Sequence, residues 1–388
     1  MKWRSRSRRK GLWSEYGKNW DWQGADDLMD LSVEICGIKL KNPIMPAAGP
    51  TVRNGDSMVK AAMGGAGALV SKTLSVAPAH VPRPCLVKIR DGLMHAELWS
   101  DITLDQWVRH ELPKAKKTGL PLLVSVGYSP DEIKKIAPRV VDAGANALEL
   151  STLYSGDIST ITEAIRAAKE AVKVPVFVKV PPGATDVVQF AQAVEAAGAD
   201  GIVAINAVGP CLVIDVENGM PILGSPNGYG WLSGQAIKPF AVRCVAEIAR
   251  TVKIPVIGSG GISTGRDIVE FIMAGASAVQ ISTAAIIRGH KVYGLLADEM
   301  AKFMRAKGYN SINDFKGSAL RHMSEQPVRT TPKPVEVISS RCNACGLCER
   351  YCMYDAIRIV GRVARVDPVK CYGCGLCVSA CPTRALRF

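Results

Sequence analysis

The sequence of 388 residues predicts an α/β fold, in which a (β/α)8 barrel is followed by a small α+β domain rich in cysteine. Three features support this prediction. Short apolar segments alternate with helical stretches between residues 41 and 320, and the segments have two kinds of start that interleave. Strands that alternate with helices build parallel sheets, and strands buried on both faces are nearly continuous apolar runs. The third feature is a pair of cysteine runs near the end of the chain.

The eight expected strands begin either with a proline or after a Gly-Ala pair. In the second kind, the glycine is suited to end the preceding helix. The proline starts are Pro43, Pro121, Pro175 and Pro255, and the Gly-Ala pairs begin at Gly65, Gly144, Gly198 and Gly275. Helical stretches lie at 130–143, 158–172, 186–197, 235–251 and 264–274, and a helix at 290–307 closes the barrel. A doubly wound sheet is the alternative to a barrel.

The boundaries of the domains follow from these patterns. We expect a basic, Trp-containing N-terminal extension at 1–28, the barrel at 29–320, a proline-containing linker at 321–336 and the cysteine-rich domain at 337–388. The extension is either a docking arm or a segment upstream of a true start at Met29. It lacks the apolar segment of a secretory signal, and no stretch approaches the length of a membrane span. We therefore expect a cytoplasmic protein.

The two cysteine runs follow the pattern C-x2-C-x2-C-x3-C. This is the spacing of bacterial ferredoxins, in which three cysteines of a run bind one [4Fe-4S] cluster and the fourth binds the other cluster. The spacing predicts two clusters, one bound by Cys342, Cys345, Cys348 and Cys381, and the other by Cys371, Cys374, Cys377 and Cys352. Two structural zinc sites are the alternative, although zinc usually binds pairs rather than triplets of cysteines.

The net charge is +13, and residues 321–388 contain eleven Lys and Arg against five Asp and Glu. No nucleic-acid motif accompanies this surplus. We interpret it as a solvated surface or as a docking site for an acidic electron carrier.

The carboxyl ends of the strands are where a (β/α)8 barrel carries its function. Gly258-Ser-Gly-Gly-Ile262 and Gln280-Ile-Ser-Thr-Ala284 end the seventh and eighth strands, where barrels bind phosphate through backbone N–H groups. Lys72 and Lys179 end the second and fifth strands and suit an electron-rich ring, with a solvated strand end as the alternative for each. Together with the clusters these features predict FMN, because a flavin exchanges electron pairs with carbon and single electrons with clusters.

Residues 30–320 resemble the barrel of class 1 dihydroorotate dehydrogenases. The matching segments are Pro46-Ala-Ala-Gly49, Val70-Ser-Lys72-Thr, Phe177-Val-Lys179-Val-Pro-Pro, Asn206, Ser233-Gly234-Gln-Ala-Ile-Lys238-Pro, Gly258-Ser-Gly-Gly-Ile262 and Gln280-Ile-Ser-Thr283. With the cysteine domain, the layout is similar to the FMN and iron–sulfur portion of dihydropyrimidine dehydrogenase. The resemblance implies that Asn206 faces the substrate. It also implies that FMN is lined by Ala47, Ala48, Gly49, Lys72, Lys179, Gly234, Gly260, Gly261, Ser282 and Thr283.

The chain departs from this family where the family binds a pyrimidine. Tyr154 stands where the family has the Cys that acts as acid or base, Ser151 replaces an Asn, and His95 replaces another Asn. The resemblance therefore implies that the flavin machinery is kept and that the pyrimidine contacts are largely lost. We expect Tyr154 to deliver the proton, with His95 as its rival and Cys211 as a more distant candidate.

These features predict an FMN-dependent oxidoreductase of the CH–CH class, which passes electrons between the clusters, FMN and an activated C=C bond of a small conjugated carbonyl substrate. One alternative is a dihydropyrimidine or dihydroorotate dehydrogenase subunit with a non-standard acid. Another is an electron-transfer subunit without a carbon substrate of its own. Because the sequence has no convincing dinucleotide fingerprint, we expect a separate NAD(P)H–FAD subunit or a ferredoxin-type carrier as partner, in a homo- or hetero-oligomer.

Overall fold

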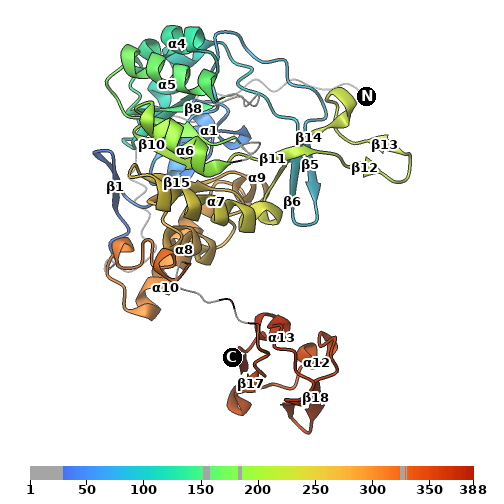
Figure 1. Cartoon of the computed structure of the whole chain (residues 1–388). Helices are drawn as coiled ribbons and strands as arrows, with labels where there is room; N and C mark the ends of the chain where they lie inside the picture. The colour runs from blue at the N-terminus through green and yellow to red at the C-terminus, as the bar shows by residue number, and fades with distance from the viewer. Residues whose placement is uncertain (1–28, 152–157, 182–185, 324–327, 329) are drawn as a thin grey trace, which may run out of the picture. The chain divides into compact units, whose positions relative to one another are not determined.

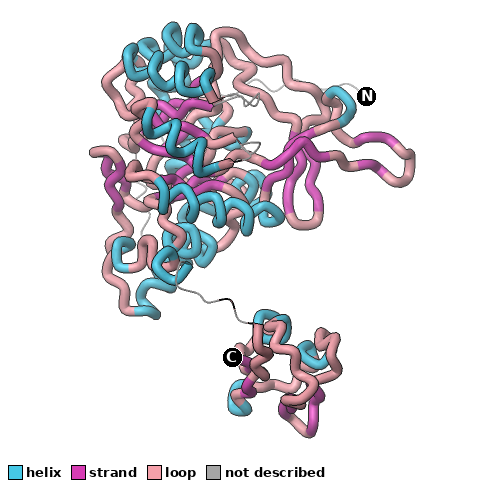
Figure 2. Tube along the Cα trace, in the orientation of Figure 1, coloured by secondary structure: helices cyan, strands magenta, loops and turns pink. Residues whose placement is uncertain are grey.

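The computed structural model of the chain describes residues 29–151, 158–181, 186–323, 328 and 330–388. The chain divides after Met323 into two compact units, which we describe separately. The first unit contains an eight-stranded parallel sheet with helices around it (Figures 1 and 2). Among the described residues, no helix is long and apolar enough to cross a bilayer.

The strands of the first unit follow one another in chain order around a barrel. They are β3 (Ile44–Pro46), β4 (Leu69–Val70), β7 (Leu122–Val126), β8 (Ala147–Ser151), β9 (Val176–Lys179), β10 (Gly201–Ala204), β15 (Val256–Ser259) and β16 (Ala278–Ile281). The last strand, β16, pairs with the first, β3. Between β3 and β4 the ring is closed by the N–H of Gly67, which donates to the carbonyl of Ile44 at 2.7 Å. The predicted (β/α)8 barrel is confirmed, and a doubly wound sheet is excluded.

Some helices of this unit begin at side-chain caps that the sequence supplies. Ser129 and Thr264 each accept from a backbone N–H three residues later, and the Glu132 and Asp267 side chains complete two capping boxes. The longer helices are α1 (Gly55–Met63), α4 (Pro130–Asp142), α5 (Ser159–Ala171), α6 (Val187–Ala196), α7 (Lys238–Thr251), α8 (Gly265–Met273) and α10 (Val292–Lys307). The shorter ones are α2 (Leu104–Gln106), α3 (Leu112–Lys116), α9 (Thr283–Arg288) and α11 (Leu320–Met323).

A hairpin closes the barrel at the amino ends of its strands. It consists of β1 (Val33–Ile35) and β2 (Ile38–Leu40). Ile35 and Leu40 belong to the apolar cluster inside the barrel, and the Cys36 thiol donates to the carbonyl of Asp200, directly before β10. Each of the two buried aliphatic side chains stabilises the closure by about 1.5–3 kcal/mol. Function is thereby left to the opposite, carboxyl end.

A second sheet, which the sequence did not predict, lies beyond the carboxyl ends of the barrel strands. It is antiparallel, in the order β11 (Val208–Cys211), β14 (Gly230–Ser233), β6 (Gly92–His95) and β5 (Leu86–Ile89). The connection between β11 and β14 carries a further hairpin of β12 (Ile214–Asp215) and β13 (Met220–Pro221). The sheet joins the segment after β4 to the segment after β10, and it therefore brings two distant loops together.

The second unit has two similar halves, each with a short helix that contains the third cysteine of its run. The elements are β17 (Glu336–Val337), α12 (Leu347–Arg350), β18 (Ile357–Val360), β19 (Val363–Val366), α13 (Leu376–Ala380) and β20 (Leu386–Arg387). Gly346 and Gly375 precede the two helices with φ of 75° and 83°, a region that favours glycine. Val335, Ile357, Ala364 and Leu386 form a small apolar core together with the buried Cys348 and Cys377. This unit is the predicted small ferredoxin-like domain.

Candidate functional site

The inner face of the barrel changes from apolar to polar towards the carboxyl ends of the strands. Side chains that share a face of a strand are two residues apart. In four strands, an apolar residue of the inner cluster is followed on the same face by a buried polar one. The pairs are Val70 and Lys72, Ala147 and Glu149, Phe177 and Lys179, and Ala278 and Gln280. A buried polar layer therefore lies above the apolar cluster.

Part of this layer is a three-residue network of Lys179, Glu149 and Gln280. The ammonium of Lys179 lies 3.6 Å from Glu149 Oε1 and donates to Gln280 Oε1 at 3.2 Å. Gln280 in turn donates to Glu149 Oε2. Glu149 is 0% exposed and Lys179 is 5% exposed, so neither charge has water to stabilise it. Removal of one partner from such a pair costs about 3–5 kcal/mol, because the other charge is left buried and unpaired.

A second cluster of polar groups surrounds Lys72, which lies two residues beyond β4. Its ammonium forms a salt bridge with Glu97, and the other oxygen of that carboxylate accepts from the Cys85 thiol at 3.2 Å. His95 ends β6 opposite Trp231 of β14, and its Nδ1 is buried with no hydrogen-bond partner among the described residues. The pKa of His95 is lowered to about 4, mainly by burial; Glu97 opposes this shift and Lys72 contributes to it. The imidazole is therefore neutral at pH 7.

Several of the residues that the resemblance assigns to FMN meet at the ends of β15 and β16. Gly234 and Gly261 have φ of 94° and 79°, and a Cβ on Gly261 would lie 2.7 Å from the Gly234 carbonyl. The Thr283 hydroxyl donates to the Ser233 hydroxyl at 2.8 Å. A Cβ on Gly49 would approach Ser282 Oγ to 3.2 Å. The segments around Gly234 and Gly261 can approach this closely only because glycine occupies position 261.

The remaining expected residues of the barrel site lie at the carboxyl ends of β3, β8, β10 and β15. Ala47 is buried, Ala48 is partly buried and Gly260 has φ of 124°. Asn206 follows β10, and its N–H donates to the carbonyl of Val180 at 3.1 Å. Tyr154 lies outside the described residues.

Ser151 at the end of β8 contacts a tyrosine that the sequence did not single out. Ser151 forms a side-chain hydrogen bond with Tyr128. Burial raises the pKa of Tyr128 to about 12, and the bond with Ser151 opposes this shift. The Tyr128 ring packs edge-on against Trp99, with centroids 5.5 Å apart. The Ser151 hydroxyl is therefore already engaged by a phenol.

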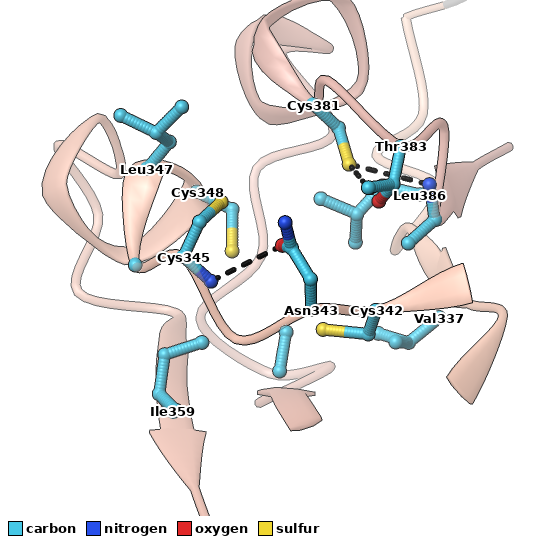
Figure 3. Close-up of a pocket in the computed structure, with 13 residues that line it drawn as sticks. Val337, Cys342, Asn343, Cys345, Leu347, Cys348, Ile359, Cys381, Thr383 and Leu386 are labelled. Carbon is cyan, nitrogen blue, oxygen red and sulfur yellow. Dashed lines mark hydrogen bonds between the residues drawn. The ribbon is translucent and has the colours of Figure 1, made fainter. Parts of the chain in front are cut away.

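In the C-terminal unit, the eight cysteines of the two runs line two cavities. Cavity I is lined by Cys342, Cys345, Cys348 and Cys381 (Figure 3). Cavity II is lined by Cys352, Cys371, Cys374 and Cys377. The cysteines are thus grouped around the two cavities as the spacing predicts for the two ligand sets, with the fourth cysteine of each run at the cavity of the other run.

The arrangement of the cysteines suits cubanes better than single ions. Among the described residues, no three His, Cys, Asp or Glu side chains converge as the ligands of one metal ion do. Each set of four cysteines instead surrounds a cavity, as a cubane requires, because each of its cysteines binds a different iron. Burial raises the pKa of Cys377 to about 11, and a bound metal would offset this shift because it holds a coordinating thiol in its deprotonated form.

Comparison with known families agrees with this architecture. The family model described as dihydroorotate dehydrogenase matches residues 30–304. The chain belongs to the dihydroorotate dehydrogenase family. A model described as a 4Fe-4S dicluster domain matches residues 341–385.

Curated members of the dihydroorotate dehydrogenase family match three quarters of the chain. It is 36% identical over 302 residues to the catalytic subunit of dihydroorotate dehydrogenase B (NAD(+)) from Methanothermobacter thermautotrophicus, an alignment that covers 74% of this chain and 98% of the relative. It is 37% identical over 304 residues to the same subunit from Methanosarcina mazei, with 74% and 95% covered. For the subunit from Pyrococcus abyssi the identity is 34% over 303 residues, with 75% and 99% covered.

As a member of the dihydroorotate dehydrogenase family, the chain is an FMN-dependent oxidoreductase, and its dicluster domain adds two [4Fe-4S] clusters. The described residues fit FMN. Two buried lysines, Lys72 and Lys179, lie at the carboxyl end of the barrel, together with a buried histidine nitrogen that has no partner in the part of the chain that the structure describes. Glycines with positive φ meet at the ends of β15 and β16, where a barrel of this kind binds phosphate.

The sequence did not predict four polar residues of this site. Three of them are Glu97, Tyr128 and Glu149, and the fourth is Gln280, which was expected only as part of a strand end and not for its hydrogen-bonding side chain. Glu149 and Gln280 could have been found, since each lies two residues beyond an inward apolar position of its strand. Glu97 lacks such a pattern because it follows a strand of the unpredicted second sheet.

Proposed function

We propose that this chain reduces the activated C=C bond of a small conjugated carbonyl compound that carries no carboxylate. When bound, FMN supplies hydride transfer to carbon and single-electron exchange with the clusters. The membership of the family supports the reaction class, and the charges of the barrel site support the choice of substrate.

The observation that carries this proposal is the pairing of both buried lysines with carboxylates. Lys72 pairs with Glu97 and Lys179 with Glu149, so these four side chains have no net charge. Dihydroorotate carries a carboxylate, and burial of an anion is costly unless a cation or several donors compensate it. Glu97 would also repel a carboxylate placed beside Lys72. A neutral substrate avoids both penalties.

The proposed roles of the individual residues follow from their places in the barrel. Lys72 and Lys179 are proposed to contact the flavin ring. The phosphate of FMN is proposed to be bound by Gly234, Gly260, Gly261, Ser282 and Thr283. Asn206 and Ser151 are proposed to contact the substrate. Tyr154 is proposed as the proton donor, since a phenol with a pKa near ~10 donates better than it accepts at neutral pH. His95 is a poor rival, because its imidazole is already neutral.

The substrate is tested with anaerobically reduced holoprotein and a panel of acceptors, while flavin reoxidation is followed. We expect neutral enones, lactams or thioesters to reoxidise the flavin and orotate to be slow. Glu97→Gln should increase the rate of flavin reoxidation by orotate relative to the rate with neutral acceptors. Asp215→Asn, on the β12–β13 hairpin, is the matched control. Fast reoxidation by orotate in the unchanged protein would contradict the proposal. Reoxidation by no acceptor would favour a pure electron-transfer subunit.

We further propose that a separate NAD(P)H–FAD subunit or ferredoxin-type carrier supplies the electrons. The curated relatives are named as catalytic subunits of NAD(+) enzymes, which supports a partner of this kind. The basic surplus of residues 321–388 suits an acidic carrier. Reduction by such a carrier should slow steeply as salt rises, because exposed charges are screened within about 8 Å at physiological ionic strength. A rate independent of salt, or fast reduction by NADH alone, would reject this arrangement.

A further inference from the structure

The two halves of the C-terminal unit present the same hydrogen bond to their last cysteines. The backbone N–H of Ala385 donates to Cys381 Sγ at 3.2 Å, and that of Ala356 donates to Cys352 Sγ at 3.3 Å. Cys381 lines cavity I, whereas Cys352 lines cavity II. Because these two bonds are equivalent, they give neither cluster an advantage. The side chains around the two cysteines, by contrast, differ.

The first difference is the residue two positions after each of these cysteines. The Thr383 hydroxyl lies 3.6 Å from Cys381 Sγ. A sulfur bound to iron is a thiolate and has no proton to give, so the hydroxyl is the donor. Tyr354 occupies the equivalent place beside Cys352, and its ring stacks on Tyr372 with centroids 4.7 Å apart and planes at 16°. Cavity I therefore has a hydroxyl donor where cavity II has a stacked ring.

The second difference is the sign of the charge one residue further along. Arg384 follows Thr383 and Asp355 follows Tyr354. Both residues have a positive φ, of 51° and 48°. Arg384 lies in the chain between two residues that line cavity I, and Asp355 lies between two that line cavity II, so a cation adjoins the first lining and an anion the second. Both side chains are exposed, so salt reduces their influence.

The third difference lies directly after the first cysteine of each run. Asn343 lines cavity I, whereas Tyr372 lines cavity II. The N–H of Cys345 donates to Asn343 Oδ1 at 3.3 Å (Figure 3). Since only oxygen can accept this bond, the amide NH2 remains as a donor among the cysteines of cavity I.

We propose that the two clusters have unequal reduction potentials and that cluster I, held in cavity I, has the higher one. Reduction adds negative charge to a cluster and its thiolates. Hydrogen-bond donors and a nearby cation stabilise that charge, while a nearby anion opposes it. All three differences act in the same direction. In half-reduced protein the electron therefore resides on cluster I, and cluster II is the stronger reductant.

The test is an anaerobic redox titration of the holoprotein, followed by electron paramagnetic resonance. The unchanged protein should show two separate reduction steps. Thr383→Val keeps the shape of the side chain and removes the hydroxyl, so the step at higher potential should move to a lower potential while the other stays. Thr383→Ser, which keeps the donor, should leave both steps in place.

Reciprocal variants keep the proposal testable if Thr383→Val fails to bind eight irons. Tyr354→Thr should raise the step at lower potential. The double exchange Asp355→Arg with Arg384→Asp should reduce the difference between the two reduction potentials at low salt, and should have less effect at high salt. Equal potentials in the unchanged protein would overturn the proposal. So would a Thr383→Val variant that moves the step at lower potential, or a Tyr354→Thr variant that moves neither step.

Discussion

The two redox sites of this chain are built in opposite ways. In the C-terminal unit, all eight cysteines come from two short runs, 342–352 and 371–381. In the barrel, Lys72, Glu149, Lys179 and Gln280 follow or belong to four different strands. The geometry of the first site depends on local turns and short helices, while that of the second depends on the register of the whole sheet. Changes in the first site should therefore act locally, whereas changes in the second should affect both chemistry and stability.

The largest expected effect is the loss of one cluster. Cys374→Ala removes a ligand of cluster II, and the iron content should fall from about eight atoms to about four, since each cubane contains four irons. The FMN content and the thermal unfolding of the barrel should not change. Cys36→Ser is the matched control, because Cys36 belongs to neither run and a hydroxyl can replace its bond to the Asp200 carbonyl. Loss of flavin together with iron in Cys374→Ala would show that the two sites are not independent.

In the barrel, removal of the proposed proton donor, Tyr154, should lower the rate of substrate reduction more than removal of a neighbouring polar group. Tyr154→Phe should reduce the rate of substrate reduction by about 10²–10⁴-fold, the usual contribution of a positioned acid. Flavin reduction by the donor should stay fast, and both cofactors should remain bound. Stopped-flow measurement of the two half-reactions separates these effects.

Tyr128→Phe is the control for this experiment, because it removes the other phenol near the end of β8. A phenol whose pKa is raised to about 12 gives up its proton less readily than one near ~10, so the effect should be smaller. If Tyr128→Phe abolished substrate reduction while Tyr154→Phe did not, the acid would be Tyr128.

The contrast between the sites also explains how far the sequence could predict them. The barrel strands and the two ligand sets could be predicted, because proline and Gly-Ala starts mark the strands and fixed spacing marks the cysteines. Lys72 and Lys179 were found at strand ends, but their carboxylate partners were not. Glu97 follows β6, whose place in the second sheet is fixed in part by pairing with β14, a strand more than 130 residues later. No local pattern records such a pairing.

A pH experiment sharpens the comparison, because the barrel site contains a buried histidine. The pKa of His95 is about 4 in the folded chain, mainly because of burial, while an unfolded histidine has a pKa near ~6.5. Between these pH values the unfolded chain binds more protons than the folded one, so the free energy of unfolding should fall as pH drops through this window. At pH 4 the loss from this group would be at most about 3 kcal/mol.

His95→Gln should lack this contribution, since glutamine does not titrate. The measurement is urea unfolding of both holoproteins at several pH values between 7 and 5, and the informative quantity is the difference between their free energies of unfolding. Protonation of the cluster cysteines or of surface carboxylates is common to both proteins and cancels in that difference. A wild-type curve that stays parallel to that of His95→Gln over this range would mean that the imidazole is solvated, and that the polar layer beside Lys72 is open to water.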